Sequence, residues 1–429
     1  MFMKIRFVNA RILTMKENEP IYFGELEVKD HLITYVGPAR NTDEAFDRTI
    51  DCKGNLLMPG FKNAHTHSAM TFLRSYADDL PLNEWLFHKV FPLEDLLTPN
   101  DIYELSKIAI LEYLTSGITA NFDMYMQPHM IAKASIDTGF KTVILGCVNN
   151  FTESVSIMKE NYQLLNHLSP LIQYRLGFHA EYTTDYKILE ELSKLSHELH
   201  EPVFTHSSET PHEVEGCKSR YQKTPTELFD DLGLFDYGGG CYHCVSMTPH
   251  DLEILKEKHV SVITCPGSNT KLASGIAPIV EMQKYGLNLA IGTDGPASNN
   301  ALDMFREMFL VTGLQKLSLQ DASAMDAIDV LKMATVGGAR AMGLYDADLL
   351  DINKEADIIM IDLHQPNMQP INHIEKNIVY SGSKQNVILT MVHGKILYEN
   401  GTFHSGEDVE ALYERCQKIT ERIQNSVKQ

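Results

Sequence analysis

The sequence predicts an α/β protein in which a (β/α)8 TIM barrel is joined to a small composite β-sandwich domain formed by both termini. From residue 58 onward, short apolar runs alternate with amphipathic segments, and roughly eight such units in about 285 residues match the size of a closed barrel. Both ends of the chain carry strand-like patterns instead, which predicts a separate sheet. The chain has 429 residues, 44% of them apolar, which is ample for both cores.

The first part of the chain is rich in β-forming residues that polar turns interrupt. Runs at residues 5–15, 26–36 and 49–57 predict strands, and they end where the barrel pattern begins. We expect these strands to form the N-terminal half of the small β domain.

The middle of the chain contains the short apolar runs that predict the buried parallel strands of the barrel. The segments between these runs have helical spacing, as in Ile188, Leu192 and Leu195. The predicted strands lie at residues 56–63, 118–123, 142–148, 174–179, 202–206, 239–243, 260–264 and 289–293.

After residue 344 the chain becomes strand-like again, and it ends in a polar helical segment at 408–427. We therefore expect a composite β domain from residues 1–57 and 345–405, a barrel over 58–344 and a C-terminal helix over 406–429. The predicted late strands lie at residues 356–363, 377–381, 387–392 and 395–398.

Composition and charge exclude several classes of function. A net charge of −20 disfavours binding to nucleic acid or to anionic lipid. No apolar stretch approaches the roughly 18 residues of a membrane span, and no leader pattern opens the chain. The seven cysteines at irregular spacings fit the reducing cytoplasm better than a disulfide framework. A small-molecule partner is expected, and a homo-oligomer remains open.

Metal-ligand residue types end several of the predicted barrel strands. His65 and His67 are two residues apart, so in an extended segment both imidazoles face the same side. His206 ends the fifth predicted strand and Asp294 follows the eighth. Active sites of such barrels form at the carboxyl ends of the strands. Three histidines and one carboxylate, with a position left for water, predict a hydrolytic metal centre.

Two further residues of this rim are candidates for proton transfer. Glu209 lies three residues beyond His206, where it can face the pocket without acting as a ligand. His243 ends the sixth predicted strand, which favours contact with the attacking water. Alone, each would be an ordinary loop carboxylate or core histidine, and only the neighbouring ligands favour function.

Cysteine motifs suggest other chemistry, which the sequence context disfavours. Cys241 and Cys244 have a Cys-x-x-Cys spacing, but no second pair accompanies them and they end a late strand, so we interpret them as structural. Cys265-Pro266 lacks the Pro-Cys-x-x-Cys order of cytidine deaminases.

Taken together, these motifs resemble the amidohydrolase superfamily over nearly the whole chain and in the same order. Within it, the sequence looks most like the deaminases of 5′-methylthioadenosine and S-adenosylhomocysteine, through residues 70–74 and 79–86. The matching segments are PGFKNAHTH at 59–67, THSSET at 205–210, HCV at 243–245, SNTKL at 268–272 and GTDGPASNN at 292–300.

The resemblance implies a role for each matched residue. His65, His67, His206 and Asp294 would bind one divalent ion, usually zinc, with iron or manganese as alternatives. Proton transfers would involve Glu209, His243 and Asp294. The substrate-binding residues would be Glu84 for the ribose hydroxyls, His179 for the purine, and the neighbouring Trp85. Binuclear relatives use a lysine after strand four, and residues 176–179 contain none, so one metal is expected.

Two departures from the relatives concern the substrate. Relatives that accept S-adenosylhomocysteine carry arginines after strand three, whereas no arginine lies between Lys141 and Arg175. Glu181 stands where relatives tend to have proline, so it would either alter the preferred ring or point to solvent. The implied reaction is hydrolytic deamination of an adenine nucleoside. Deamination of guanine, a pterin or a triazine is the alternative, and an inactive amidohydrolase-like scaffold is a remote one.

Overall fold

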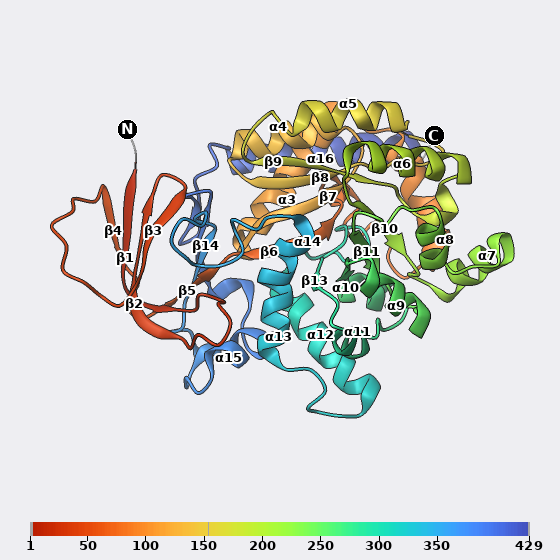
Figure 1. The fold of residues 1–429 in the computed structure, drawn as a ribbon. Coiled ribbons are helices and arrows are strands. Elements are labelled where there is room, and N and C mark those ends of the chain that lie inside the picture. Colours follow the sequence, from red (N-terminus) through yellow and green to blue (C-terminus); the bar gives the residue numbers. More distant parts are fainter. Residues whose placement is uncertain (1–2, 153, 428–429) are drawn as a thin grey trace.

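The computed structural model describes residues 3–152 and 154–427. Over these residues the strands form a nine-stranded sheet built from both ends of the chain and an eight-stranded parallel sheet from its middle. In Figure 1 the N-terminal strands lie to the left and the parallel sheet, surrounded by helices, lies to the right. The predicted fold class, a barrel with a second sheet from the termini, is confirmed.

The terminal sheet joins segments that are far apart in the sequence. Its central pair is β5 with β14, which run antiparallel with Leu57 opposite Met360. Their inward side chains share one buried core with those of β1 and β2. The sheet contains β1 (Lys4–Ile12), β2 (Tyr22–Lys29), β3 (Leu32–Gly37), β4 (Arg48–Asp51), β5 (Leu56–Pro59), β14 (Ile358–Ile361), β15 (Val387–Val392), β16 (Lys395–Glu399) and β17 (Thr402–Phe403). The predicted limits between the domains stay a prediction.

The strands of the parallel sheet follow one another in sequence order. The last strand meets the first through local bonds: Asp294 N donates to His65 O at 3.0 Å, and Asn63 pairs with Thr293. Gly292 allows this approach, because an added Cβ would lie 2.7 Å from His65 Cβ. The strands are β6 (Phe61–Thr66), β7 (Ile118–Met124), β8 (Lys141–Leu145), β9 (Ile172–Gly177), β10 (Val203–Ser207), β11 (Gly239–His243), β12 (Val260–Thr264) and β13 (Leu289–Ile291).

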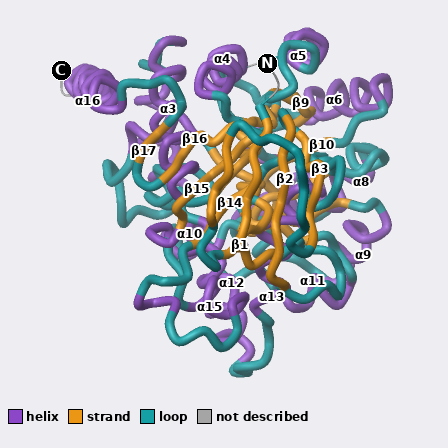
Figure 2. Tube along the Cα trace, turned by 90° about the vertical axis from the view of Figure 1, so that its left-hand side faces the viewer, coloured by secondary structure: helices purple, strands orange, loops and turns teal. Residues whose placement is uncertain are grey.

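Helices surround the parallel sheet (Figure 1), and Figure 2 shows the terminal sheet from its outer side, with helices around it. Several begin with a threonine N-cap followed by proline, a pattern that satisfies free backbone N–H groups and fixes the first turn. The helices around the parallel sheet are α3 (Pro99–Thr115), α4 (Pro128–Thr138), α5 (Val155–Leu165), α6 (Tyr186–Leu199), α7 (Pro211–Tyr221), α8 (Pro225–Asp231), α9 (Pro249–Glu257), α10 (Pro266–Lys271), α11 (Ile279–Tyr285), α12 (Met304–Leu319), α13 (Ala327–Lys332), α14 (Gly338–Met342) and α16 (Val409–Val427). None of the described helices is both long and apolar enough to cross a membrane.

A run of short helical turns follows β6 and leads to α3. It contains a 3-10 turn at Ser68–Leu73, α1 (Leu82–Trp85), a π-helical turn at Leu86–Val90 and α2 (Phe91–Glu94). Side chains of its later part reach the site described below.

Several predicted strands are wrong in extent or type. The predicted strand 56–63 is two strands, because at Gly60 the chain changes from pairing with β14 to pairing with β7. An added Cβ at Gly60 would lie 2.1 Å from Thr119 Cγ2, so this bend requires glycine. The runs 26–36 and 49–57 each contain a turn between two strands. The predicted strand 377–381 lies in α15 (Ile374–Tyr380), which buries Ile374 and Ile378 at helical spacing.

Candidate active site

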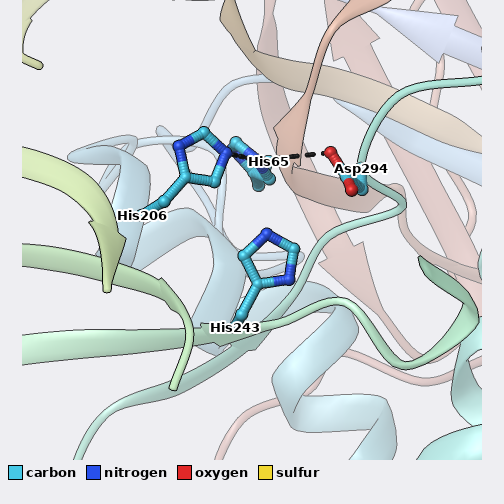
Figure 3. A group of neighbouring side chains, drawn as sticks. All are labelled: His65, His206, His243 and Asp294. Carbon is cyan, nitrogen blue, oxygen red and sulfur yellow. Dashed lines mark hydrogen bonds and ion pairs between the residues drawn. The ribbon is translucent and has the colours of Figure 1, made fainter. Parts of the chain in front are cut away.

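Four buried side chains from separate elements converge at the carboxyl ends of the parallel strands. They are His65 on β6, His206 on β10, His243 at the end of β11 and Asp294 after β13. One potential ligand atom from each lies within 4.8 Å of the others. Figure 3 shows the rings and the carboxylate pointing toward a common centre.

His67 lies beside this group. Its Nε2 is 3.2 Å from Asp294 Oδ1, and its ring stacks on that of His206 with centroids 5.5 Å apart. The structure therefore brings together all four predicted ligands, and it adds His243 as a fifth neighbour. The group within 4.8 Å contains His243 and not His67, so among the predicted ligands His67 is the one that lies beside the group.

Hydrogen bonds from the outer nitrogens fix which way the histidine lone pairs point. Nδ1 of His67 faces Met124 O at 2.5 Å, Nδ1 of His206 faces His179 O at 2.7 Å, and Nδ1 of His243 faces Asn269 Oδ1 at 2.8 Å. Because each partner is an acceptor, we assign the proton to Nδ1 in all three rings. Each Nε2 then faces inward, as in metal-ligating histidines, and two of these atoms have close neighbours there: His206 Nε2 lies 3.1 Å from His65 Nε2, and His67 Nε2 lies 3.2 Å from Asp294 Oδ1.

Charge at the centre also fits a cation. Burial lowers the pKa of His65 to about 3 and the pKa of His206 well below its usual value, so both rings are neutral. Burial acts to raise the pKa of Asp294, but hydrogen bonding with His65 and His67 holds it well below its usual value. His67 differs, because burial acts to lower its pKa but Asp294 raises it. Imidazole nitrogens around an ionised carboxylate are the donor set of a divalent metal. The residues present therefore fit such an ion.

Asp294 is oriented by two serines. Ser268 Oγ and Ser298 Oγ donate to its Oδ2 at 2.6 and 2.7 Å, which turns Oδ1 toward the histidines. Asp294 also has a φ of 58°, and His243 has a φ of 67°. Left-handed backbone is unfavourable for residues other than glycine and is often found at functional sites.

Glu209 lies next to the metal-ligand group without belonging to it. Its Oε2 is 4.0 Å from His243 Nε2, and Ser274 Oγ donates to its Oε1 at 3.4 Å. The side chain is buried, and burial raises its pKa. A carboxyl group with a raised pKa holds its proton more readily, which suits it to donate a proton in general acid catalysis.

A cavity of about 340 Å³ opens onto this centre, within the usual size range of small-molecule sites. His179 and Trp85 line it, as predicted for substrate contacts. Glu84 does not: it is exposed on α1, between lining residues on the same turn. Among the described residues that line the cavity there is no lysine or arginine. The other aromatic side chains of the wall are Phe87, Phe91, Tyr125, Phe151 and Tyr182.

Glu181 does not point to solvent, so that alternative is wrong, and it is not among the residues that line the cavity; an effect on the preferred ring stays a prediction. Its side chain is buried and forms a two-point ion pair with Arg220, with Nε 3.1 Å from Oε1 and Nη2 2.5 Å from Oε2. Arg220 is at the end of α7, whereas Glu181 begins the turn that carries Tyr182. The pair therefore ties a wall of the cavity to α7.

Sequence reasoning missed several residues of the site. Glu94 is buried, lines the cavity and accepts a hydrogen bond from Tyr125 Oη at 2.6 Å, and burial raises its pKa to about 7. Ser268, Asn269 and Ser298 lie within the motifs that match the family. The motifs could therefore have identified these residues, but they do not show that the two serines bind Asp294 and that Asn269 binds His243. For Glu94 the sequence offers no signal.

Comparisons with known proteins agree with this geometry. The Amidohydrolase family model matches residues 56–397. A 5-methylthioadenosine/S-adenosylhomocysteine deaminase of Caldanaerobacter subterraneus subsp. tengcongensis is 37% identical over 435 residues, covering 99% of both chains. One from Moorella thermoacetica is 39% identical, covering 92% of this chain and 94% of its own. The crystal structure of an adenosine deaminase from Xanthomonas campestris with bound zinc is 31% identical, with a TM-score of 0.93, covering 99% of this chain and 98% of its own.

Proposed function

This chain belongs to the amidohydrolase family, and we propose that it releases ammonia from an adenine nucleoside with a small neutral 5′ substituent. The observation that carries the proposal is the group of inward-facing histidine nitrogens around Asp294, next to Glu209 and at the end of an aromatic cavity. Relatives of similar length that are named as deaminases of 5-methylthioadenosine and S-adenosylhomocysteine support the substrate class.

We propose that one zinc ion is held by His65, His67, His206 and Asp294. The inward lone pairs and the zinc-bound structural neighbour support this set. When bound, such an ion supplies the Lewis acidity that makes a water molecule nucleophilic at neutral pH. Residues 176–179 contain no lysine that could bridge a second ion, so we propose a single one.

The residues around the centre then divide the proton chemistry between them. Asp294 takes the proton of the attacking water and passes it to the leaving amine. Glu209 donates a proton to the purine ring nitrogen, which makes C6 more electrophilic, and it regains a proton from the C6 hydroxyl when the C6–N bond breaks and the carbonyl forms. His243 accepts a hydrogen bond from the attacking water through Nε2, because its Nδ1 is engaged by Asn269. His179 is neutral, because burial lowers its pKa to about 3, and it contacts the purine without adding charge.

The wall of the cavity supports a neutral 5′ group. Cys147 and Asn149, which follow β8, line it together with Glu94 and Asp95. A substrate carboxylate at this wall would find acidic groups and no lysine or arginine among the described lining residues. Burying a carboxylate without a cationic partner is unfavourable. Methylthioadenosine and 5′-deoxyadenosine are therefore the proposed substrates, ahead of S-adenosylhomocysteine.

Substrate preference is the direct test of this function. We expect kcat/KM for methylthioadenosine or 5′-deoxyadenosine to exceed that for S-adenosylhomocysteine at least about tenfold, which corresponds to roughly 1.4 kcal/mol. Ammonia release is measured on these three compounds, adenosine, guanine and a pterin. A preference for S-adenosylhomocysteine would contradict the argument that this wall disfavours a substrate carboxylate. Activity only on guanine or the pterin would instead support the alternative substrate class.

We further propose that Glu84 binds the ribose hydroxyls, which requires its helix to turn inward when substrate binds. Two hydrogen bonds to a carboxylate contribute roughly 1.5–3 kcal/mol each before desolvation. Glu84→Ala should therefore lower kcat/KM for nucleosides by at least about tenfold and leave a slow reaction on free adenine nearly unchanged. The nearby exposed Asp79→Ala serves as the control. Equal losses on nucleoside and base would indicate a structural role.

We propose the cytoplasm as the location of the protein. The seven cysteines, all among the described residues, form no disulfide in the structure, which suits a reducing compartment. Oligomeric state is left to measurement by light scattering.

A further inference from the structure

The turn that presents Glu209 has an unfavourable backbone. Ser208, directly before it, has a φ of 52°, in the left-handed region that residues other than glycine rarely adopt. This turn joins β10, which carries His206, to α7. Such a conformation persists only where surrounding contacts impose it.

Val245 N and Ser246 N donate to Ser208 O at 3.0 and 2.8 Å, and Glu213, in the first turn of α7, supplies the side-chain contacts. Its buried carboxylate accepts one hydrogen bond from Ser208 N at 2.9 Å and another from Glu209 N at 2.8 Å. The α7 helix begins at the cap Thr210, whose Oγ1 accepts from Glu213 N at 3.2 Å. Both N–H groups that Glu213 binds therefore lie before the cap, outside the helix.

Other helices of the same chain use this position differently. In α3, α8 and α9 the acidic residue three places after the cap accepts the N–H of the cap residue itself, which closes a capping box within the helix. In α7 the equivalent carboxylate reaches past the cap to the two preceding residues. Helix capping alone does not require this reach, so the arrangement of Glu213 serves the turn.

We propose that Glu213 is a positioning residue that fixes the Ser208–Glu209 turn and thereby holds the Glu209 carboxyl group at the centre. The proposal rests on the proposed function of Glu209. Glu213 itself does not line the cavity, so it acts through Glu209 and not on the substrate. Misplacing a catalytic group by about 1 Å can cost roughly 10²-fold in rate.

Glu213→Gln is the main test, because an amide keeps one acceptor and turns an N–H group toward a backbone N–H. We expect kcat to fall about tenfold to a hundredfold, with KM and metal content little changed. Glu215→Gln, an exposed glutamate on the same helix, is the matched control and should retain wild-type kcat. A wild-type kcat in Glu213→Gln, or an equal loss in both variants, would overturn the proposal.

A double-mutant cycle separates positioning from general stability. If Glu213 acts through Glu209, Glu213→Gln should cause little further loss of kcat in a Glu209→Gln background. An undiminished loss there would overturn the proposal. If Glu213→Gln does not fold, Glu213→Asp, which keeps both acceptor oxygens on a shorter side chain, takes its place in the same cycle with a smaller expected loss.

A readout independent of turnover distinguishes this inference from the proposed reaction. Hydrogen exchange at the Ser208 and Glu209 amides should become faster in Glu213→Gln than in wild type or Glu215→Gln, whatever the substrate. Unchanged exchange would overturn the role of Glu213. Wild-type protein that releases no ammonia from any nucleoside would instead contradict the proposed function alone.

Discussion

Glu209→Gln is expected to lower kcat by about 10²–10⁴ on every nucleoside that the protein deaminates, which is the usual contribution of a general acid–base group. The amide has nearly the same shape as the carboxyl group but cannot carry the proton to the ring nitrogen. Burial, which raises the pKa of Glu209, is what prepares the group for this role in wild type. Single-turnover ammonia release measures the chemical step directly.

Metal content and unfolding temperature should stay at the wild-type level in Glu209→Gln, because its carboxyl group contacts Ser274 at 3.4 Å and His243 at 4.0 Å, and neither is a proposed ligand. Ser274→Ala is a useful companion, since Ser274 Oγ donates only a long 3.4 Å hydrogen bond to Glu209. Its loss of kcat should be far smaller. If Glu209→Gln kept more than about a tenth of wild-type turnover, another group would have to carry the proton.

The fold was predictable from the sequence wherever one local pattern decides the structure. The apolar runs that end at Thr264 and near His206 are buried on both faces, and parallel strands buried in this way read as continuous apolar segments. The exchange of partners at Gly60 was not predictable, because it depends on Asp357 O and Gly117 O, which lie far away in the sequence.

The site was predictable to a similar degree and for a related reason. Ligand-type residues at strand ends must meet in a barrel, so the proximity of His65, His67, His206 and Asp294 follows from topology. The hydrogen-bond and ion-pair partners of the side chains around the site do not follow from the topology. The ion pair of Glu181 could not be predicted, because its partner, Arg220, lies 39 residues away on a helix whose orientation no local pattern specifies.

Removing a proposed metal ligand should have an even larger effect than removing Glu209. We expect wild-type protein to hold about one equivalent of divalent metal, and His206→Ala or Asp294→Ala to lose most of it together with nearly all turnover. Even residues that only orient a ligand cost 10–100-fold in metal affinity when they are replaced, so a ligand should cost more. Elemental analysis after dialysis measures this, with the exposed His250→Ala as the control.

His67 and His243 allow a sharper version of the metal experiment, because both are histidines at this centre and both have Nδ1 engaged by a side-chain or backbone oxygen. If His67 is the ligand, His67→Ala should lose metal, whereas His243→Ala should keep about one equivalent and lose turnover only. His67 Nε2 lies 3.2 Å from Asp294 Oδ1, which favours His67 as a ligand, whereas His243 is the histidine that lies within 4.8 Å of His65, His206 and Asp294, so the experiment decides between them. The reverse result, metal kept in His67→Ala and lost in His243→Ala, would move His243 into the ligand set and leave His67 beside it. Two equivalents in wild-type protein would contradict the single-ion proposal in either case.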